Sequence, residues 1–128
     1  MKIQKGIASI NDTQTYFEIA GEGRCLTLVH GNTMDTRVWD QQFGYFAEHY
    51  RVLRYDLRGC GKSEEPTSPY AFDRDLKSLL DYLNIEQTAV LGISVGGGIA
   101  LNFTLNYPEK VYALVAVDPF MTGFAWPQ

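Results

Sequence analysis

The sequence is short of cysteine, histidine and long hydrophobic runs, and each shortage excludes a class of protein. Two cysteines, Cys25 and Cys60, are too few for a disulfide framework or, by themselves, for a zinc site, so we expect free thiols and no bound metal. No apolar run approaches the ~18 residues of a membrane-spanning helix. Residues 1–5 lack the apolar segment of a signal peptide. We therefore expect a cytoplasmic protein with no membrane partner.

Positive charge is also scarce. Lysine and arginine number 11 against 15 aspartates and glutamates, which gives a formal net charge of −4. A protein that binds nucleic acid through its phosphates needs a basic surface, so we expect no nucleic-acid partner. The 45% of hydrophobic and 20% of charged residues are typical of a folded domain. Because no repeat or shift in composition divides the chain, residues 1–128 are interpreted as one domain.

The apolar pattern predicts strands that alternate with helices. Residues 6–10 and 15–20 resemble a hairpin, and the alternation in the second segment predicts a half-buried strand. Short apolar runs, typical of strands covered on both faces, occupy residues 25–29, 51–55, 87–93 and 110–117. Helical spacing or composition marks residues 36–50 and 75–83 and the segment between Ser94 and Pro108. This order predicts an α/β fold with a mostly parallel, twisted sheet and an antiparallel start.

A serine lies where one buried strand meets a helix, within a G-x-S-x-G pattern at residues 92–96. At so sharp a turn the strand and the helix pass closely, which explains Gly92 and Gly96. The turn would expose the hydroxyl of Ser94 as a nucleophile, and the N–H of Val95 could stabilise negative charge on a substrate oxygen. The alternative is a serine that only caps the helix, which needs no chemistry but also no flanking glycines.

A second loop can supply another backbone donor to the same site. His30, Gly31 and Asn32 follow the strand at residues 25–29. An oxyanion site needs two donors, and the N–H of Asn32 is the candidate for the second. Two roles are open for His30: a hydrogen bond that fixes the shape of the loop, or a catalytic base.

These motifs, together with residues 56–63 and the helix at residues 75–83, resemble the α/β-hydrolase superfamily. The likeness is to its esterases, proline iminopeptidases, haloperoxidase-like enzymes and C–C bond hydrolases. It implies an α/β-hydrolase fold in which Ser94 is the nucleophile. Haloalkane dehalogenases share the His-Gly-Asn segment but use an aspartate nucleophile, so dehalogenation is disfavoured by Ser94.

The glycine-rich loop at residues 56–63 has two interpretations. Residues 61–63, Gly-Lys-Ser, resemble the end of a phosphate-binding loop, but that pattern needs glycine where Asp56 stands, and Pro66 and Pro69 lie where its helix should begin. No G-x-G-x-x-G pattern is present either, so no nucleotide cofactor is expected. The family resemblance implies instead a structural loop formed by Asp56, Arg58, Gly59, Gly61 and Ser63.

The chemistry that would activate Ser94 is missing. A serine nucleophile needs a histidine base, and the base needs an acid that orients it. His49 precedes the strand at residues 51–55 and resembles a remote helix end, and Asp118 is the one candidate acid. The resemblance implies a chain about twice as long, so we expect an α/β-hydrolase fold truncated after about its sixth strand.

Two functions remain open. The first is a hydrolase of small-molecule esters, amides or related acyl compounds, without a cofactor, and inactive as the isolated 128-residue chain. The second is a non-catalytic remnant that serves as a binding or assembly module. In both, the apolar strand at residues 110–117 would be an unpaired edge, which favours self-association or pairing with a complementing C-terminal segment.

Overall fold

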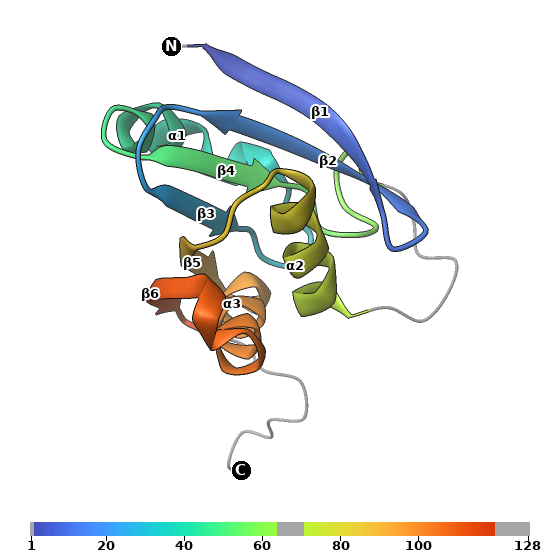
Figure 1. Cartoon of the computed structure of the whole chain (residues 1–128). Coiled ribbons are helices and arrows are strands. Elements are labelled where there is room, and N and C mark those ends of the chain that lie inside the picture. Colours follow the sequence, from blue (N-terminus) through green and yellow to red (C-terminus); the bar gives the residue numbers. More distant parts are fainter. Residues whose placement is uncertain (1, 64–70, 120–128) are drawn as a thin grey trace.

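A computed structural model describes residues 2–63 and 71–119, and their strands form one six-stranded sheet (Figure 1). The strands are β1 (Ile3–Ile10), β2 (Thr13–Ala20), β3 (Cys25–Val29), β4 (Arg51–Tyr55), β5 (Thr88–Ile93) and β6 (Val111–Val117). The helices are η1 (Thr36–Trp39), α1 (Asp40–Ala47), α2 (Phe72–Tyr82), α3 (Val95–Asn106) and η2 (Pro108–Lys110), of which η1 and η2 are 3₁₀ helices.

The strand order is β1-β2-β4-β3-β5-β6. The β1–β2 and β2–β4 pairs are antiparallel, and the β3–β4, β3–β5 and β5–β6 pairs are parallel. The α/β fold with an antiparallel start, predicted from the apolar pattern, is thereby confirmed. The apolar runs of β3, β4 and β5 are explained by this order, because strands inside a parallel sheet are covered on both faces.

Helices cover the sheet on both faces (Figure 1). On one face, α2 and α3 pack over a core that includes Val29, Leu53 and Val90. On the other, η1 and α1 pack over a smaller core that includes Leu28 and Val52. Side chains of successive strand residues point to opposite faces, so adjacent residues such as Leu28 and Val29 supply the two cores.

The prediction of a half-buried strand at residues 15–20 is wrong, because β2 lies between β1 and β4 and those residues are all buried. Polar side chains stay buried there because they pair with one another. Glu18 accepts hydrogen bonds from Tyr16 Oη at 2.6 Å and from Arg54 Nη2 at 2.8 Å. Burial alone would raise the pKa of Glu18, but these bonds lower it, while burial and the Glu18 carboxylate raise the pKa of Tyr16 to about 12.

The continuous helix expected at residues 36–50 is in fact two shorter ones, η1 followed by α1. The first N–H groups of η1 are held by carboxylates: Asp56 Oδ1 accepts from the N–H of Thr36 at 2.8 Å, and Asp35 Oδ1 accepts from the N–H of Arg37 at 2.9 Å. Anchored in this way, the segment starts with a tight 3₁₀ turn before α1 continues it. The chain thus leaves the carboxyl end of β3 in a fixed direction.

Candidate active site

The loops that follow the parallel strands meet at one edge of the sheet. Val29 pairs with both Tyr55 and Gly92, and Ile93 pairs with Val117, so β3, β4, β5 and β6 end at nearly the same level. Ligands of open α/β sheets bind outside these carboxyl ends. The residues that directly follow the four strands are His30, Asp56, Ser94 and Asp118.

Ser94 has the backbone conformation of a sharp strand-to-helix turn. Its φ of 55° and ψ of −123° lie in a region that residues with a side chain seldom adopt. Its N–H donates to the carbonyl oxygen of Val117 at 2.9 Å, so the turn is tied to the end of β6. A serine that caps a helix has an extended backbone and a hydroxyl bonded to the helix. Ser94 has neither, since no capping bond from its side chain is found among the described residues.

Gly92 and Gly96 are required by the close approach of backbone to backbone. A Cβ atom on Gly92 would overlap the carbonyl oxygen of Gly96, at the start of α3. A Cβ atom on Gly96 would overlap the carbonyl oxygens of Val29 and His30, at the end of β3. The spacing of the two glycines around Ser94 therefore reflects contact of α3 with both β5 and the loop after β3.

The loop after β3 and the first turn of α3 adjoin Ser94. A Cβ atom built on Gly31 would lie 3.2 Å from Ser94 Cβ, so the loop after β3 touches the serine. Asn32, the next residue, is exposed. Val95 is the first residue of α3, where N–H groups have no acceptor within the helix and point out of its positive end.

His30 is fully buried, with no exposed surface, and both of its ring nitrogens are engaged. The N–H of Leu57 donates to Nε2 at 2.9 Å, so Nε2 is an acceptor, and Nδ1 must carry the proton that bonds to the carbonyl oxygen of Gly31 at 2.7 Å. Burial lowers the pKa of His30, against the opposing effects of the Gly31 carbonyl, Asp56 and Asp35. With no free nitrogen, the ring is not placed as a base in this structure.

The fold does not bring His49, the other histidine, close to Asp118, the candidate acid. His49 follows α1 near the start of β4, and its ring lies 5.5 Å from that of Tyr45. The start of β4 is the opposite end of the parallel strands from Ser94. Asp118 lies at the same edge as Ser94, directly after β6, with an exposed side chain and a φ of 45°.

Asp56 organises the glycine-rich loop. Its Oδ2 accepts from the N–H of Lys62 at 2.8 Å, and its backbone oxygen accepts from Ser63 Oγ at 2.7 Å. Ser63 Oγ in turn accepts from the N–H of Tyr16 at 3.0 Å. A phosphate-binding loop offers its N–H groups to a ligand, whereas here the internal carboxylate accepts from one of them. Pro66 and Pro69 lie outside the described residues.

The remaining motif residues of the loop shape its backbone. Gly59 and Gly61 have positive φ angles of 80° and 50°, and a Cβ atom on Gly61 would overlap the Asp56 carboxylate. Arg58 forms a bidentate ion pair with Asp75 of α2, with Nη2–Oδ1 and Nε–Oδ2 distances of 2.9 and 3.0 Å. Sequence reasoning missed Asp75, because nothing in the pattern of α2 distinguishes it from a surface aspartate.

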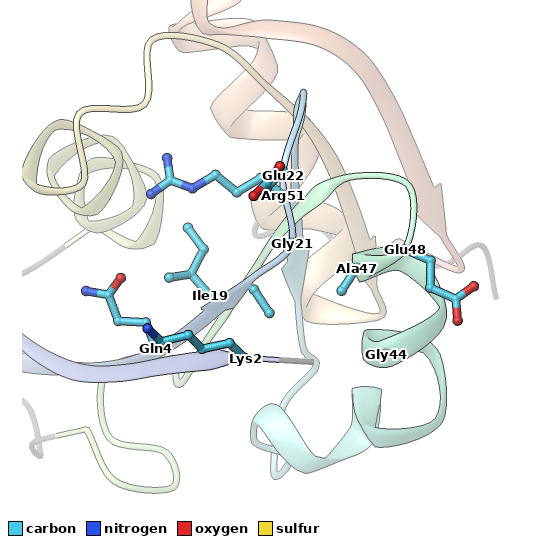
Figure 2. Close-up of a pocket in the computed structure, with 10 residues that line it drawn as sticks. Lys2, Gln4, Ile19, Gly21, Glu22, Gly44, Ala47, Glu48 and Arg51 are labelled. Carbon is cyan, nitrogen blue, oxygen red and sulfur yellow. The ribbon is translucent and has the colours of Figure 1, made fainter.

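A groove among the described residues lies away from these loops. This groove, of about 810 Å³, lies between the first residues of the chain, the end of β2 and the end of α1 (Figure 2). Lys2, Gln4, Gly21, Ala47 and Arg51 are among its lining residues. Because Arg51 begins β4, the groove is at the amino edge of the parallel strands, and we assign it no part in the chemistry of Ser94.

The described residues lack two other features that would suggest a different function. In residues 2–63 and 71–119, no three histidine, cysteine, aspartate or glutamate side chains are grouped so that they could hold a metal ion. Over the same ranges, no helix has both the length and the apolar character needed to cross a bilayer.

Comparison with known proteins defines the family. A family model described as the alpha/beta hydrolase fold matches residues 25–128. The chain therefore belongs to the α/β-hydrolase family, in agreement with the resemblance carried by its motifs.

Individual relatives support the same family assignment. The chain is 31% identical over 119 residues to 3-oxoadipate enol-lactonase 2 of Acinetobacter baylyi, covering 89% of this chain and 45% of that protein. It is 39% identical over 105 residues to the pimeloyl-[acyl-carrier protein] methyl ester esterase of Aliivibrio fischeri, covering 82% of this chain and 40% of that protein. The solved structure of the epoxide hydrolase CorEH superposes with a TM-score of 0.90 at 28% identity, covering 98% of this chain and 47% of that one. The chain thus spans less than half the length of these relatives.

Proposed function

We propose that this chain carries the nucleophile and the oxyanion-binding loops of a serine hydrolase that acts on a small-molecule ester, amide or related acyl compound. The observation that supports this most directly is the backbone of Ser94, with its φ of 55° between β5 and α3. Strain of this kind persists where the surrounding structure enforces it, and it is concentrated at active sites. The names of the lactonase and the methyl ester esterase favour an acyl substrate.

The proposed reaction is acyl transfer through Ser94. The hydroxyl oxygen attacks the acyl carbon while its proton passes to a base, and the carbonyl oxygen becomes an oxyanion that accepts from the N–H groups of Val95 and Asn32. Collapse of this intermediate expels the alcohol or amine, which takes up the proton, and leaves an acyl-serine ester. Water then attacks the ester while giving a proton to the base, and the acyl–oxygen bond breaks. The acid leaves, and the base returns the proton to the Ser94 hydroxyl. Asp118 is the candidate acid for orienting the base.

The 128-residue chain by itself is proposed to be nearly inactive, because neither of its histidines is placed as that base. His30 has both nitrogens in hydrogen bonds, and His49 is at the other end of the strands. A nucleophile and oxyanion donors without a base retain only a small part of the rate enhancement. A fluorophosphonate probe tests this: we expect slow labelling that is confined to Ser94 and absent in Ser94→Ala. Rapid stoichiometric labelling would show that a base is present after all.

The alternative is a non-catalytic binding or assembly module, which is favoured because neither His30 nor His49 is placed as a base for Ser94. Hydrolysis of a short-chain nitrophenyl ester separates the two functions. Slow turnover above background that is lost in Ser94→Ala supports the hydrolase, and rates equal to background in both proteins support the module.

A second copy of this chain is the proposed partner at the edge of β6. Among the described residues β6 pairs only with β5, and none of its seven residues is charged. The other edge strand, β1, carries Lys5, and such charges deter edge-to-edge pairing. Lys110, which precedes β6, is already paired with Asp81 at 3.1 Å, so the apolar edge itself, rather than charge pairing at its ends, favours a second copy as the partner. A complementing segment would instead leave the protein monomeric.

A further inference from the structure

We infer that His30 is a positioning residue, which fixes the direction of the Asn32 N–H by holding the other end of the same peptide group. The inference rests on the proposed function, since it concerns the oxyanion site of Ser94. It goes further by assigning the buried imidazole a defined task, one that requires its neutral form.

The peptide group between Gly31 and Asn32 links the His30 ring to the proposed oxyanion donor. The carbonyl of Gly31 and the N–H of Asn32 belong to the same peptide unit, and the described residues contain no cis peptide bond. In a trans peptide these two groups point in opposite directions. Because the Gly31 oxygen is bonded to the buried Nδ1–H of His30, the Asn32 N–H points away from the ring. A Cβ atom on Gly31 would lie 3.2 Å from Ser94 Cβ, so an Asn32 N–H turned away from the ring would be directed to a substrate oxygen bound at that serine.

A second hydrogen bond holds the ring. The N–H of Leu57, in the loop after β4, donates to Nε2. Asp56, the preceding residue, is itself buried and bonded to the N–H groups of Thr36 and Lys62. The ring is thus a bridge between two loops, and chains of hydrogen bonds of this kind polarise one another. The donor chain runs from Leu57 through the ring to the Gly31 oxygen, and it increases the donor strength of the Asn32 N–H.

The arrangement exists only while the imidazole is neutral. In the charged form both nitrogens carry protons, so Nε2–H would face the Leu57 N–H and their hydrogen bond would be lost. The charged groups that influence the ring are Asp56 and Asp35, which favour the charged form, whereas burial opposes it and lowers the pKa of His30. The hydrogen bonds of His30 therefore hold the loop after β3 at neutral pH. They are lost only in acid, at a pH below the usual pKa of histidine.

The first test uses NMR of the full-length ¹⁵N,¹³C-labelled chain and does not depend on catalysis. We expect the Nδ1–H tautomer for His30, and a Gly31 carbonyl carbon that titrates with the ring at one midpoint below 6.5. In His30→Gln, whose amide can donate and accept but does not ionise, the Gly31 signal should not vary with pH. His49→Gln, which removes the exposed histidine, is the matched control and should leave the titration unchanged. The opposite tautomer, or a Gly31 carbonyl that ignores the titration, would overturn the inference.

The second test measures the slow fluorophosphonate labelling of Ser94. Small displacements of a catalytic group can cost about 100-fold in rate, so we expect a loss of roughly that size in His30→Leu and a smaller one in His30→Gln. Labelling of a serine without a base slows in acid in every variant, so the readout is the ratio of the wild-type rate to the His30→Gln rate. This ratio should fall in acid with the Gly31 titration. Equal rates in the wild type and a folded His30→Leu would overturn the positioning role alone. Labelling no faster than in Ser94→Ala, in every variant, would overturn the proposed function as well.

Discussion

Ser94 concentrates backbone strain in one residue, and this strain can be measured. Its positive φ costs a residue with a Cβ atom of the order of 1–3 kcal/mol, whereas glycine adopts it freely. We expect Ser94→Gly to be more stable than Ser94→Ala by about 1 kcal/mol, because both lose the hydroxyl but only glycine relieves the strain. Urea unfolding followed by circular dichroism measures the difference. An alanine variant as stable as the glycine variant would mean that the turn is relaxed.

Gly96 is constrained in a different way, by contact rather than by its own φ. Alanine is preferred to glycine inside a helix by about 1 kcal/mol, so Gly96→Ala would stabilise α3 if there were space. The added Cβ would instead overlap two carbonyl oxygens at the end of β3, and we expect a net loss of about 2 kcal/mol or more. Gly31→Ala is the control, since the contacts at Gly31 are 3.2 Å, and it should lose less. The same urea titrations compare the two variants.

Between elements, the ion pair of Arg58 with Asp75 links the loop after β4 to α2. Both side chains are buried, at 2% and 8% exposure, and removing one partner of a buried pair typically costs 3–5 kcal/mol. We expect Arg58→Met to lose stability in this range, moderated by Asn11 Nδ2, which also donates to Asp75. Lys77→Ala breaks an exposed pair with Asp81 on the same helix and should change stability far less than Arg58→Met does. Thermal unfolding of the two variants tests the contrast.

Features set by neighbouring residues could be predicted from the sequence, and features set by partners far along the chain could not. The parallel strands and the turn at Ser94 were predictable, because apolar runs and the spacing of Gly92 and Gly96 are local signals. The burial of Glu18 was not, since it depends on Arg54, a partner on another strand. The engagement of both His30 nitrogens likewise depends on Leu57, far along the chain. Alternation of polar and apolar residues therefore misleads wherever polar side chains are paired inside the sheet.

For the whole molecule, the edge strands should determine whether copies associate. Val115 of β6 and Ile7 of β1 are β-branched and similarly exposed, at 53% and 48%, so lysine at either position adds one charge to one edge at comparable local cost. If β6 pairs with its counterpart, Val115→Lys places two added charges near the two-fold axis and should give a monomer in light scattering at micromolar concentration. Ile7→Lys should leave the mass unchanged. A wild-type monomer would contradict the proposed dimer. If β6 backbone amides in that monomer were also protected from hydrogen exchange, another segment of the same chain would be the element that covers the edge.

Association also changes how stability depends on concentration. A dimer that unfolds to two chains gains stability by mass action, so its melting temperature rises with protein concentration, by roughly 3 °C for each tenfold increase in a chain of this size. The wild type and Ile7→Lys should both show this rise, and Val115→Lys should show none. Because the comparison uses the slope within each variant, any direct effect of the added lysine on the fold cancels. Equal slopes in Val115→Lys and the wild type would place the interface elsewhere than at β6.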